Sequence, residues 1–292
     1  MTASLLTLCR RYADARVDQN GTALTAVPGL AIIRALHAGE LQVAVNKPLI
    51  AMLLQGRKRV FSGLESHEYG PGEVLVICAD APTVSQVTQA SPAVPYYALV
   101  LELDAAVLRD LMTGMSPTKG TAHPVRIDPL DEHVADAALR LVRLLDQPDA
   151  LTALAGGALR EMHYWLLAGS HGDAIRRIGL VDSHAERVGR AVALLRREFM
   201  KTIRVEQLAV VAGMSEPAFH LHFRRVTTLS PVQLQKQLRL IEARRMMLAD
   251  GSSIAQAAHA VGYQSVSQFT REYGRLFGAP PRRDIQRAKE HA

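Results

Sequence analysis

The amino-acid sequence predicts an α+β protein with a β-rich N-terminal part and an all-helical C-terminal part. Three observations lead to this expectation: short apolar runs broken by Gly, Pro and Asn between residues 28 and 103, helical periodicity over residues 104–168, and a helical pattern that occurs twice after residue 205. A chain of 292 residues with 48% hydrophobic residues is long enough for two buried cores. We therefore expect one domain over residues 1–180 and a second over residues 181–292.

Seven short strands are expected in the N-terminal part. Each is rich in apolar residues, and turn signals such as Asn46-Lys47-Pro48 and Gly70-Pro71-Gly72 separate them. Many short strands at this spacing are typical of a small antiparallel β-barrel or jelly roll. The expected strands are Leu30–Ala35, Leu41–Val45, Leu49–Gln55, Lys58–Ser62, Glu73–Ala79, Thr83–Thr88 and Tyr96–Glu102.

Helices are expected to follow the strands. Apolar residues recur at helical spacing in two stripes, one through Val134 and Leu141 and one through Leu154 and Met162. The Gly-Ser-His-Gly-Asp segment at residues 169–173 has the composition of a hinge, and a helix from His184 to Met200 would lead into the second domain.

The stretch from Val205 to Pro281 contains the same short pattern twice. In each copy an apolar helix has an alanine four residues before a glycine (Gly213 or Gly262), which suits a close helix contact and a left-handed helix end. A serine, Ser215 or Ser265, then serves as N-cap of a second helix with aromatic residues at i, i+4 spacing. Two copies in register predict two helix-turn-helix units whose inner faces carry Phe219, Phe223, Phe269, Tyr273 and Phe277.

The two copies align at an offset of 50 residues, which pairs Phe219 with Phe269 and Pro231 with Pro281. Residues 232–249 between them contain no Gly or Pro. Eighteen residues would form a helix about 27 Å long. Such a helix would hold the two second helices about 34 Å apart, one turn of DNA, on one face of a duplex.

The charge is unevenly distributed along the chain. Residues 187–292 contain 18 Lys and Arg against 8 Asp and Glu, a net charge of +10, whereas residues 1–186 carry a net charge of −4. A basic C-terminal third beside a mildly acidic remainder predicts that one end of the chain binds a polyanion.

Both parts of the chain resemble a known family. The two helical units, the connecting I-E-A-R-R-M-M-L and the ending V-G-Y-Q-S-V-S-Q-F-T-R-E-Y-G-R-L-F-G-A-P-P look like the DNA-binding domain of AraC/XylS-type transcriptional regulators. The segments P-G-L-A-I-I-R, L-L-Q-G-R-K-R-V and Y-G-P-G-E-V-L-V-I-C-A-D-A-P look like the cupin-type sensory domain of one branch of that family. The resemblance implies a small-molecule effector bound by a cupin-like domain, a homodimer, promoter DNA and RNA polymerase as partners, and activation as the commoner outcome.

Outward-facing residues of the two second helices are the expected base-reading residues. His220 can bond to a purine edge and Leu221 can pack on a thymine methyl, while Gln268 matches adenine and Arg271 matches guanine. The full set is Pro217, His220, Leu221, Ser267, Gln268 and Arg271; Ser267 and Gln268 have the alternative of capping the helix or bonding phosphate. Phosphate contacts are assigned to Arg224, Arg225, Arg245, Arg275, Arg282 and Arg283.

Candidate sensing residues lie in the β-rich part. Cys78 is either a small core residue or a thiol sensor, and Arg57 and Arg59 are either solvated or hold an acidic effector. His67 lacks the His-x-His pair of metal-binding cupins, which disfavours a metal site. We expect no cofactor and no catalytic residue, and therefore no enzyme activity.

No apolar run reaches the ~18 residues of a membrane span, and the N-terminus lacks a signal-peptide pattern, so a soluble cytoplasmic protein is expected. The presence of only two cysteines, Cys9 and Cys78, fits a reducing compartment. Two other functions stay open from the sequence: a metal-dependent cupin enzyme that carries a DNA tether, and an architectural DNA-bending protein without an effector.

Overall fold

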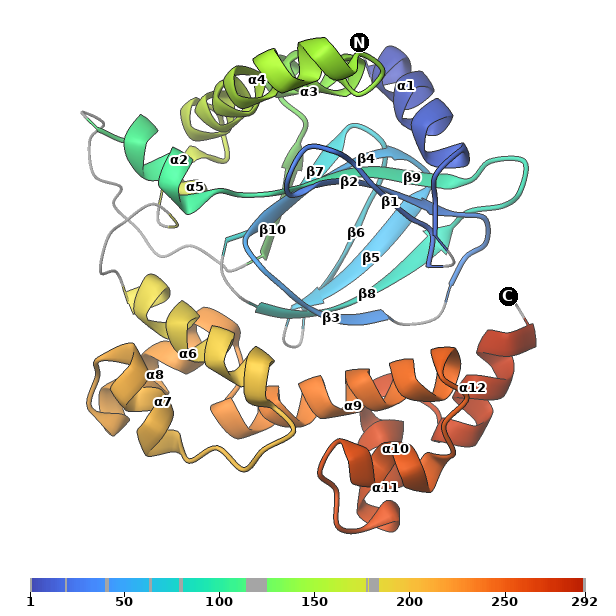
Figure 1. The fold of residues 1–292 in the computed structure, drawn as a ribbon, viewed down its shortest axis with the longest axis vertical. Helices are drawn as coiled ribbons and strands as arrows, with labels where there is room; N and C mark the ends of the chain where they lie inside the picture. The colour runs from blue at the N-terminus through green and yellow to red at the C-terminus, as the bar shows by residue number, and fades with distance from the viewer. Residues whose placement is uncertain are drawn as a thin grey trace. The chain divides into compact units, whose positions relative to one another are not determined.

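The computed structural model describes residues 2–18, 20–39, 42–62, 65–78, 81–113, 125–176, 178 and 184–290. The chain forms two compact units. The first comprises Met1–Gly39, Asn46–Ala81 and Ser85–Ser183, and the second comprises His184–Ala292 together with Glu40–Val45 and Pro82–Val84. The first unit combines β-sheets with helices and the second core is helical, so the predicted α+β class is confirmed (Figure 1).

The strands of the chain form two sheets. The six-stranded sheet has the order β1-β2-β9-β4-β7-β10, and the four-stranded sheet has the order β3-β8-β5-β6. The strands are β1 (Thr22–Leu24), β2 (Leu30–Ala35), β3 (Gln42–Asn46), β4 (Leu49–Gln55), β5 (Arg57–Ser62), β6 (Glu65–Tyr69), β7 (Glu73–Ile77), β8 (Ala81–Gln89), β9 (Tyr96–Glu102) and β10 (Val125–Pro129). Among the described strands no single closed barrel forms. Of the two predicted arrangements, a barrel or a jelly roll, the closed barrel is therefore not formed, and the strands are divided between two sheets.

All seven expected strands are present, and β2, β4 and β9 have the expected bounds. Three strands were not anticipated, each for a local reason. β1 has only three residues, and β6 has the polar sequence Glu-Ser-His-Glu-Tyr. β10 follows a helix in the chain, yet it pairs with β7 at the edge of the six-stranded sheet.

The six-stranded sheet is apolar on both faces. Along β4, Ile50 and Met52 belong to the core that includes the helices, whereas Ala51 and Leu53 belong to a second core with residues of the four-stranded sheet. Both faces are thus covered, which explains why this strand is a continuous apolar run rather than an alternation.

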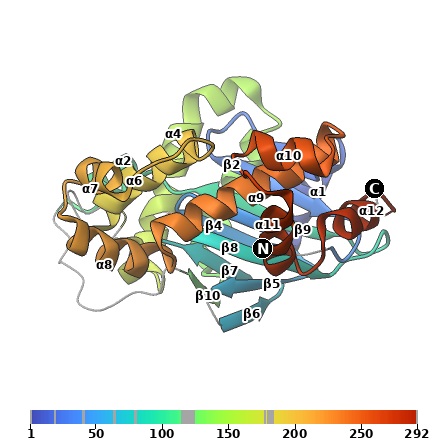
Figure 2. The same cartoon turned by 90° about the horizontal axis from the view of Figure 1, so that it is seen from below.

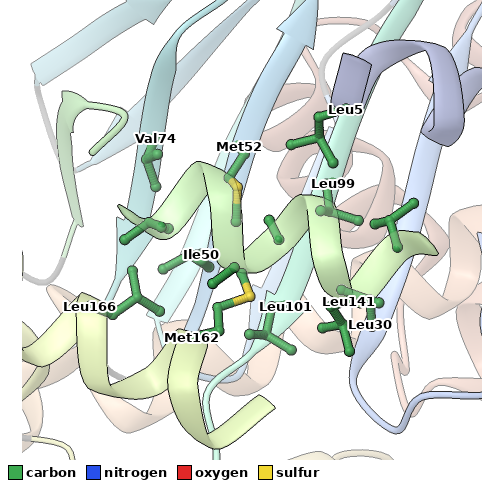
Figure 3. Packing of buried hydrophobic residues seen from close by; sticks show 14 of the residues in the cluster. Leu5, Leu30, Ile50, Met52, Val74, Leu99, Leu101, Leu141, Met162 and Leu166 are labelled. Carbon is green, nitrogen blue, oxygen red and sulfur yellow. The ribbon is translucent and has the colours of Figure 1, made fainter. Parts of the chain in front are cut away.

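Helices cover the outer face of the six-stranded sheet. α1 (Thr2–Asp14), α3 (Glu132–Leu144) and α4 (Pro148–Ala168) lie over it, and Figure 3 shows Leu5, Leu141 and Met162 among Ile50 and Leu99 of the strands. Both predicted helical stripes are therefore present, although α1 was not predicted. Two short helices, α2 (Ala105–Leu111) and α5 (Gly172–Ile175), complete this part. Within the described residues, none of the helices has both the length and the apolar character needed to cross a membrane.

The segment at residues 169–173 is packed into the first unit and is not a hinge. His171 is fully buried, and its Nδ1 donates to the Asp128 carboxylate at 3.1 Å. A Cβ atom at Gly172 would lie 2.1 Å from the Leu167 carbonyl oxygen, so this glycine is required by a close backbone contact. The composition that indicated flexibility instead reflects tight packing.

The helices of the second unit follow the predicted order. They are α6 (His184–Glu198), α7 (Val205–Ala212), α8 (Glu216–Thr227), α9 (Pro231–Ala249), α10 (Ile254–Ala260), α11 (Val266–Phe277) and α12 (Pro281–Glu290). In Figures 1 and 2, α7 and α8 lie at one end of α9, and α10 and α11 lie at its other end. The connecting helix predicted over residues 232–249 is therefore confirmed as α9.

Candidate nucleic-acid interface

The first helix-turn-helix unit consists of α7 and α8. Gly213 adopts a left-handed φ of 62°, and the Met214 amide donates to the Ala209 carbonyl oxygen at 3.0 Å, which ends α7 as predicted. Phe219 and Phe223 are fully buried in a core shared with α6. The aromatic face of α8 therefore points inward and leaves the opposite face free.

Ser215 stands at the N-cap of α8, but its side chain makes no capping hydrogen bond. An N-cap side chain accepts from the second or third backbone amide of the helix. The second position here is Pro217, which has no N–H, so one of the two possible donors is missing.

The second helix-turn-helix unit has the same construction and consists of α10 and α11. Gly262 has a left-handed φ of 89°, and the Ser265 hydroxyl accepts from the Gln268 amide at 3.3 Å, so both predicted roles are confirmed. Phe269 is fully buried between the Tyr263 ring, 5.3 Å away, and the Tyr273 ring, 5.5 Å away. The inner face of α11 is therefore an aromatic stack.

α9 connects the two helix-turn-helix units through Arg239. Its Nε donates to the Phe199 carbonyl oxygen at 2.7 Å, and its two Nη atoms reach the carbonyl oxygens of Lys201 (3.0 Å) and Gly262 (3.4 Å). One guanidinium thus joins the loop after α6, the connecting helix and the turn of the second helix-turn-helix unit. Nothing in the local sequence distinguishes Arg239 from the other arginines of this helix.

A buried ion pair joins three helices at the second helix-turn-helix unit. The Asp284 carboxylate of α12 accepts from Arg244 Nε of α9 at 2.8 Å and from the Tyr273 hydroxyl of α11. Asp284 is 3% exposed. Asp284 could not be recognised from the sequence, because a single acidic residue in a short basic helix gives no local signal of burial.

All six predicted base-reading residues are exposed. Pro217, His220 and Leu221 lie on α8, and Ser267, Gln268 and Arg271 lie on α11. Leu221 is 51% exposed, which leaves it available for an apolar contact. Within the part of the chain that the structure describes, Arg271 has neither a hydrogen bond nor an ion pair.

The arginines assigned to phosphate differ in their surroundings. Arg224, Arg225 and Arg275 are exposed on the outer faces of α8 and α11, and Arg282 and Arg283 are exposed on α12. Arg245 is also exposed, but its guanidinium bonds to the carboxylates of Glu242 at 2.8 Å and Asp250 at 3.2 Å. A phosphate would have to compete with these two carboxylates for Arg245.

The predicted sensing arginines lie on the outer side of the four-stranded sheet. Arg57 is exposed, and Arg59 pairs with Glu68 at 3.8 Å. Side chains alternate along a strand, and buried Val60 belongs to the core between the sheets. The residue of this basic run that faces the space between the sheets is therefore Lys58, which the alternation with Val60 could have identified from the sequence.

Lys58 lies beside two buried tyrosines, Tyr69 and Tyr96. It is directly opposite Tyr69 on β6, and its Nζ lies 5.9 Å from the centre of the Tyr96 ring. Tyr69 is fully buried. Within the described residues its hydroxyl makes no hydrogen bond of regular geometry, but it lies close enough to the Tyr96 hydroxyl to raise the pKa of Tyr96. Burial lowers the pKa of Lys58 to about 8.

Cys78 is 8% exposed and belongs to the core between the six-stranded sheet and the helices. It therefore does not face the space between the two sheets. Among the described residues, no group of three or more His, Cys, Asp and Glu residues is arranged to hold a metal ion.

The comparisons with known proteins agree with this geometry. A family model described as the N-terminus of AraC-type transcriptional regulators matches residues 26–174, just over half of the chain. The chain belongs to the AraC-type transcriptional regulators. A second model, a helix-turn-helix domain, matches residues 208–287, which include α8 to α11 and the part of α7 from Leu208 onward. This AraC-type regulator thus has a DNA-binding helix-turn-helix domain at its C-terminal end.

Relatives of known role match parts of this AraC-type chain. The transcriptional activator RhaS of Escherichia fergusonii is 25% identical over 156 residues, which cover 52% of this chain and 55% of RhaS. The transcriptional regulator GbdR of Pseudomonas aeruginosa is 28% identical over 107 residues, which cover 37% of this chain and 29% of GbdR. The chain thus spans about half or less of the length of these relatives.

A solved structure matches nearly the whole regulator. Wild-type ToxT from Vibrio cholerae, with an unsaturated fatty acid bound, aligns with a TM-score of 0.57 and 12% identity over 92% of this chain and 96% of ToxT. At this identity the likeness establishes the common fold.

Proposed function

We propose that this AraC-type regulator binds promoter DNA with the outer faces of α8 and α11 and changes transcription in response to a small-molecule effector. The observation that carries the proposal is the pair of recognition helices, each with a buried aromatic face and an exposed polar or basic face. α9 joins the two, so a single chain can contact two successive major grooves, as a helix-turn-helix dimer does.

The two helices make different contacts in this proposal. On α11 the unpaired guanidinium of Arg271 forks onto the O6 and N7 atoms of a guanine, and Gln268 reads a neighbouring base. On α8, His220 bonds to a base edge while Pro217 and Leu221 make apolar contacts. Arg224, Arg225 and Arg275 neutralise phosphates, with Ser267 at the start of α11 close to the backbone.

The effector is proposed to be an anion held between the two sheets by Lys58. A half-buried ammonium with a lowered pKa, beside a buried hydroxyl without a regular partner, is a site that a carboxylate would complete. The fatty acid bound by ToxT, a protein with the same fold, supports an apolar carboxylic acid as the effector class.

The remaining parts of the proposal come from the family. RhaS is an activator, which supports activation through RNA polymerase as the outcome of DNA binding. We further propose that the regulator acts as a homodimer in the cytoplasm.

The DNA half is tested by binding the full-length protein to a library in which each operator position is varied. Arg271→Ala should cost about 1–3 kcal/mol on the preferred site and remove the preference at one position. Arg225→Ala is the matched control, because loss of a phosphate contact should weaken all sequences equally. If Arg271→Ala also weakens all sequences equally, its assignment as a base reader is wrong.

The effector half is tested with decanoate and its neutral counterpart decanamide as probes. Decanoate should raise the melting temperature of the first unit more than decanamide does, and Lys58→Met should abolish the difference. Lys47→Met is the control, because Lys47 is exposed and paired with Glu102. Equal responses of Lys58→Met and the wild type would refute the anion site.

A further inference from the structure

Gln268 occupies the third position of α11, where three other helices of the second unit use a glutamine to cap themselves. In those helices the glutamine Oε1 accepts from the backbone amide of the N-cap residue at 2.9–3.0 Å. The three are Gln207, Gln233 and Gln256. Gln268 instead extends forward along the helix, and its Nε2 donates to Glu272 Oε1 at 3.1 Å. It is thus diverted from capping and held on the exposed side of α11.

Glu272 is itself held by two more donors. Lys236 Nζ donates to Oε1 at 2.8 Å, and the Tyr263 hydroxyl donates to Oε2 at 2.7 Å. Burial alone would raise the pKa of Glu272, but the hydrogen bonds from Lys236, Tyr263 and Gln268 outweigh burial and lower it. The carboxylate is therefore ionised at neutral pH and can only accept hydrogen bonds.

An acceptor-only neighbour makes the two orientations of the Gln268 amide unequal. The amide NH2 can face Glu272 Oε1, whereas a flipped amide would bring its own Oε1 against a carboxylate oxygen. Only one of the two hydrogens on Nε2 is used by Glu272. The remaining hydrogen and Oε1 leave Gln268 with one donor and one acceptor for a base.

We propose that Glu272 is a positioning residue that makes Gln268 specific for adenine. This inference rests on the proposed function, in which α11 lies in the major groove. Adenine presents an acceptor at N7 and a donor at N6, which match the fixed amide. Guanine presents two acceptors, N7 and O6, so one of them would face Gln268 Oε1 and be repelled.

Glu272→Gln tests the proposal with little change of size. An amide at this position can donate as well as accept, so Gln268 is able to flip and offer its NH2 to guanine. The full-length protein is bound to a library in which every operator position is varied. The wild type should prefer adenine over guanine by about tenfold at one position. Glu272→Gln should reduce this ratio to about twofold or less and leave preferences at other positions unchanged.

Two further variants make the result specific. Gln268→Ala identifies the position, because it should remove the preference at that base alone. Tyr263→Phe is the matched control, since it removes a hydrogen bond from Oε2 of Glu272 and keeps the bond between Oε1 and Gln268; its adenine preference should match that of the wild type.

Each other outcome refutes a defined statement. If Glu272→Gln keeps the adenine preference that Gln268→Ala removes, the positioning role is wrong while DNA reading by Gln268 stands. If Glu272→Gln weakens all sequences equally, Glu272 supports only the fold and the inference fails. A wild-type protein without base preference at any position would overturn the inference together with the proposed function.

Discussion

Replacement of Asp284 by leucine should destabilise the second unit through the loss of one buried charge. In the native protein its carboxylate accepts from Arg244 and from the Tyr273 hydroxyl, in a site where Asp284 is 3% exposed. Without that acceptor, the Arg244 guanidinium and the Tyr273 hydroxyl lose their buried hydrogen-bond partner. Three helices, α9, α11 and α12, lose their common polar contact.

The expected magnitude follows from the burial of the two partners. Removal of one partner of a buried ion pair costs about 3–5 kcal/mol. The Arg244 side chain is 19% exposed, so water recovers part of its solvation and the lower end, about 3 kcal/mol, is expected. The double variant Arg244→Met with Asp284→Leu leaves no unpaired charge, and most of the lost stability should return.

The assay uses the position of the single tryptophan. Trp165 lies on α4 of the first unit, so its fluorescence during urea unfolding of the full-length protein reports that unit. Far-UV circular dichroism also detects the helices of the second unit. Asp284→Leu should move the circular dichroism transition to lower urea and leave the Trp165 transition in place. If the double variant is no more stable than Asp284→Leu alone, the unpaired charge is not the source of the loss.

Three other perturbations have defined outcomes. DNA affinity should fall with salt at a log–log slope of about −4 for about five phosphate contacts, and a flat response would contradict the interface. Arg275→Ala should reduce this slope by about one. Arg245→Ala should reduce it by less than half of that, because two carboxylates already hold Arg245. Phe269→Ala should cost the second unit about 3–5 kcal/mol in the circular dichroism assay, whereas Arg271→Ala should leave the transition unchanged. The first unit should become more stable relative to its Lys58→Met variant as the pH rises from about 8 toward about 10. The reason is that the folded state disfavours the charged amine while the unfolded chain still binds the proton. If the difference in stability between the two proteins does not change with pH, Lys58 lies in water.

Features that depend on near neighbours in the chain could be predicted from the sequence. The period-2 and period-3.6 patterns identified seven strands and the helices of the second unit, because the side chains that pack together in one element recur at a fixed spacing. The glycines at positions 213 and 262 marked the helix ends, because only glycine adopts a left-handed φ without strain. The aromatic residues at i, i+4 spacing then separated the inner face of each recognition helix from its outer face.

Contacts between polar groups of different elements could not be predicted from the sequence, because they depend on the tertiary structure. Nothing in the local sequence relates Arg244 to Asp284, or Lys236 to Glu272, because each pair is joined by folding of residues 36 to 40 positions apart. The same holds for Arg239, whose role depends on carbonyl groups from a distant loop and turn. A charged side chain has the same local pattern whether it is solvated or buried with a partner, and only the packing of other elements around it decides between the two.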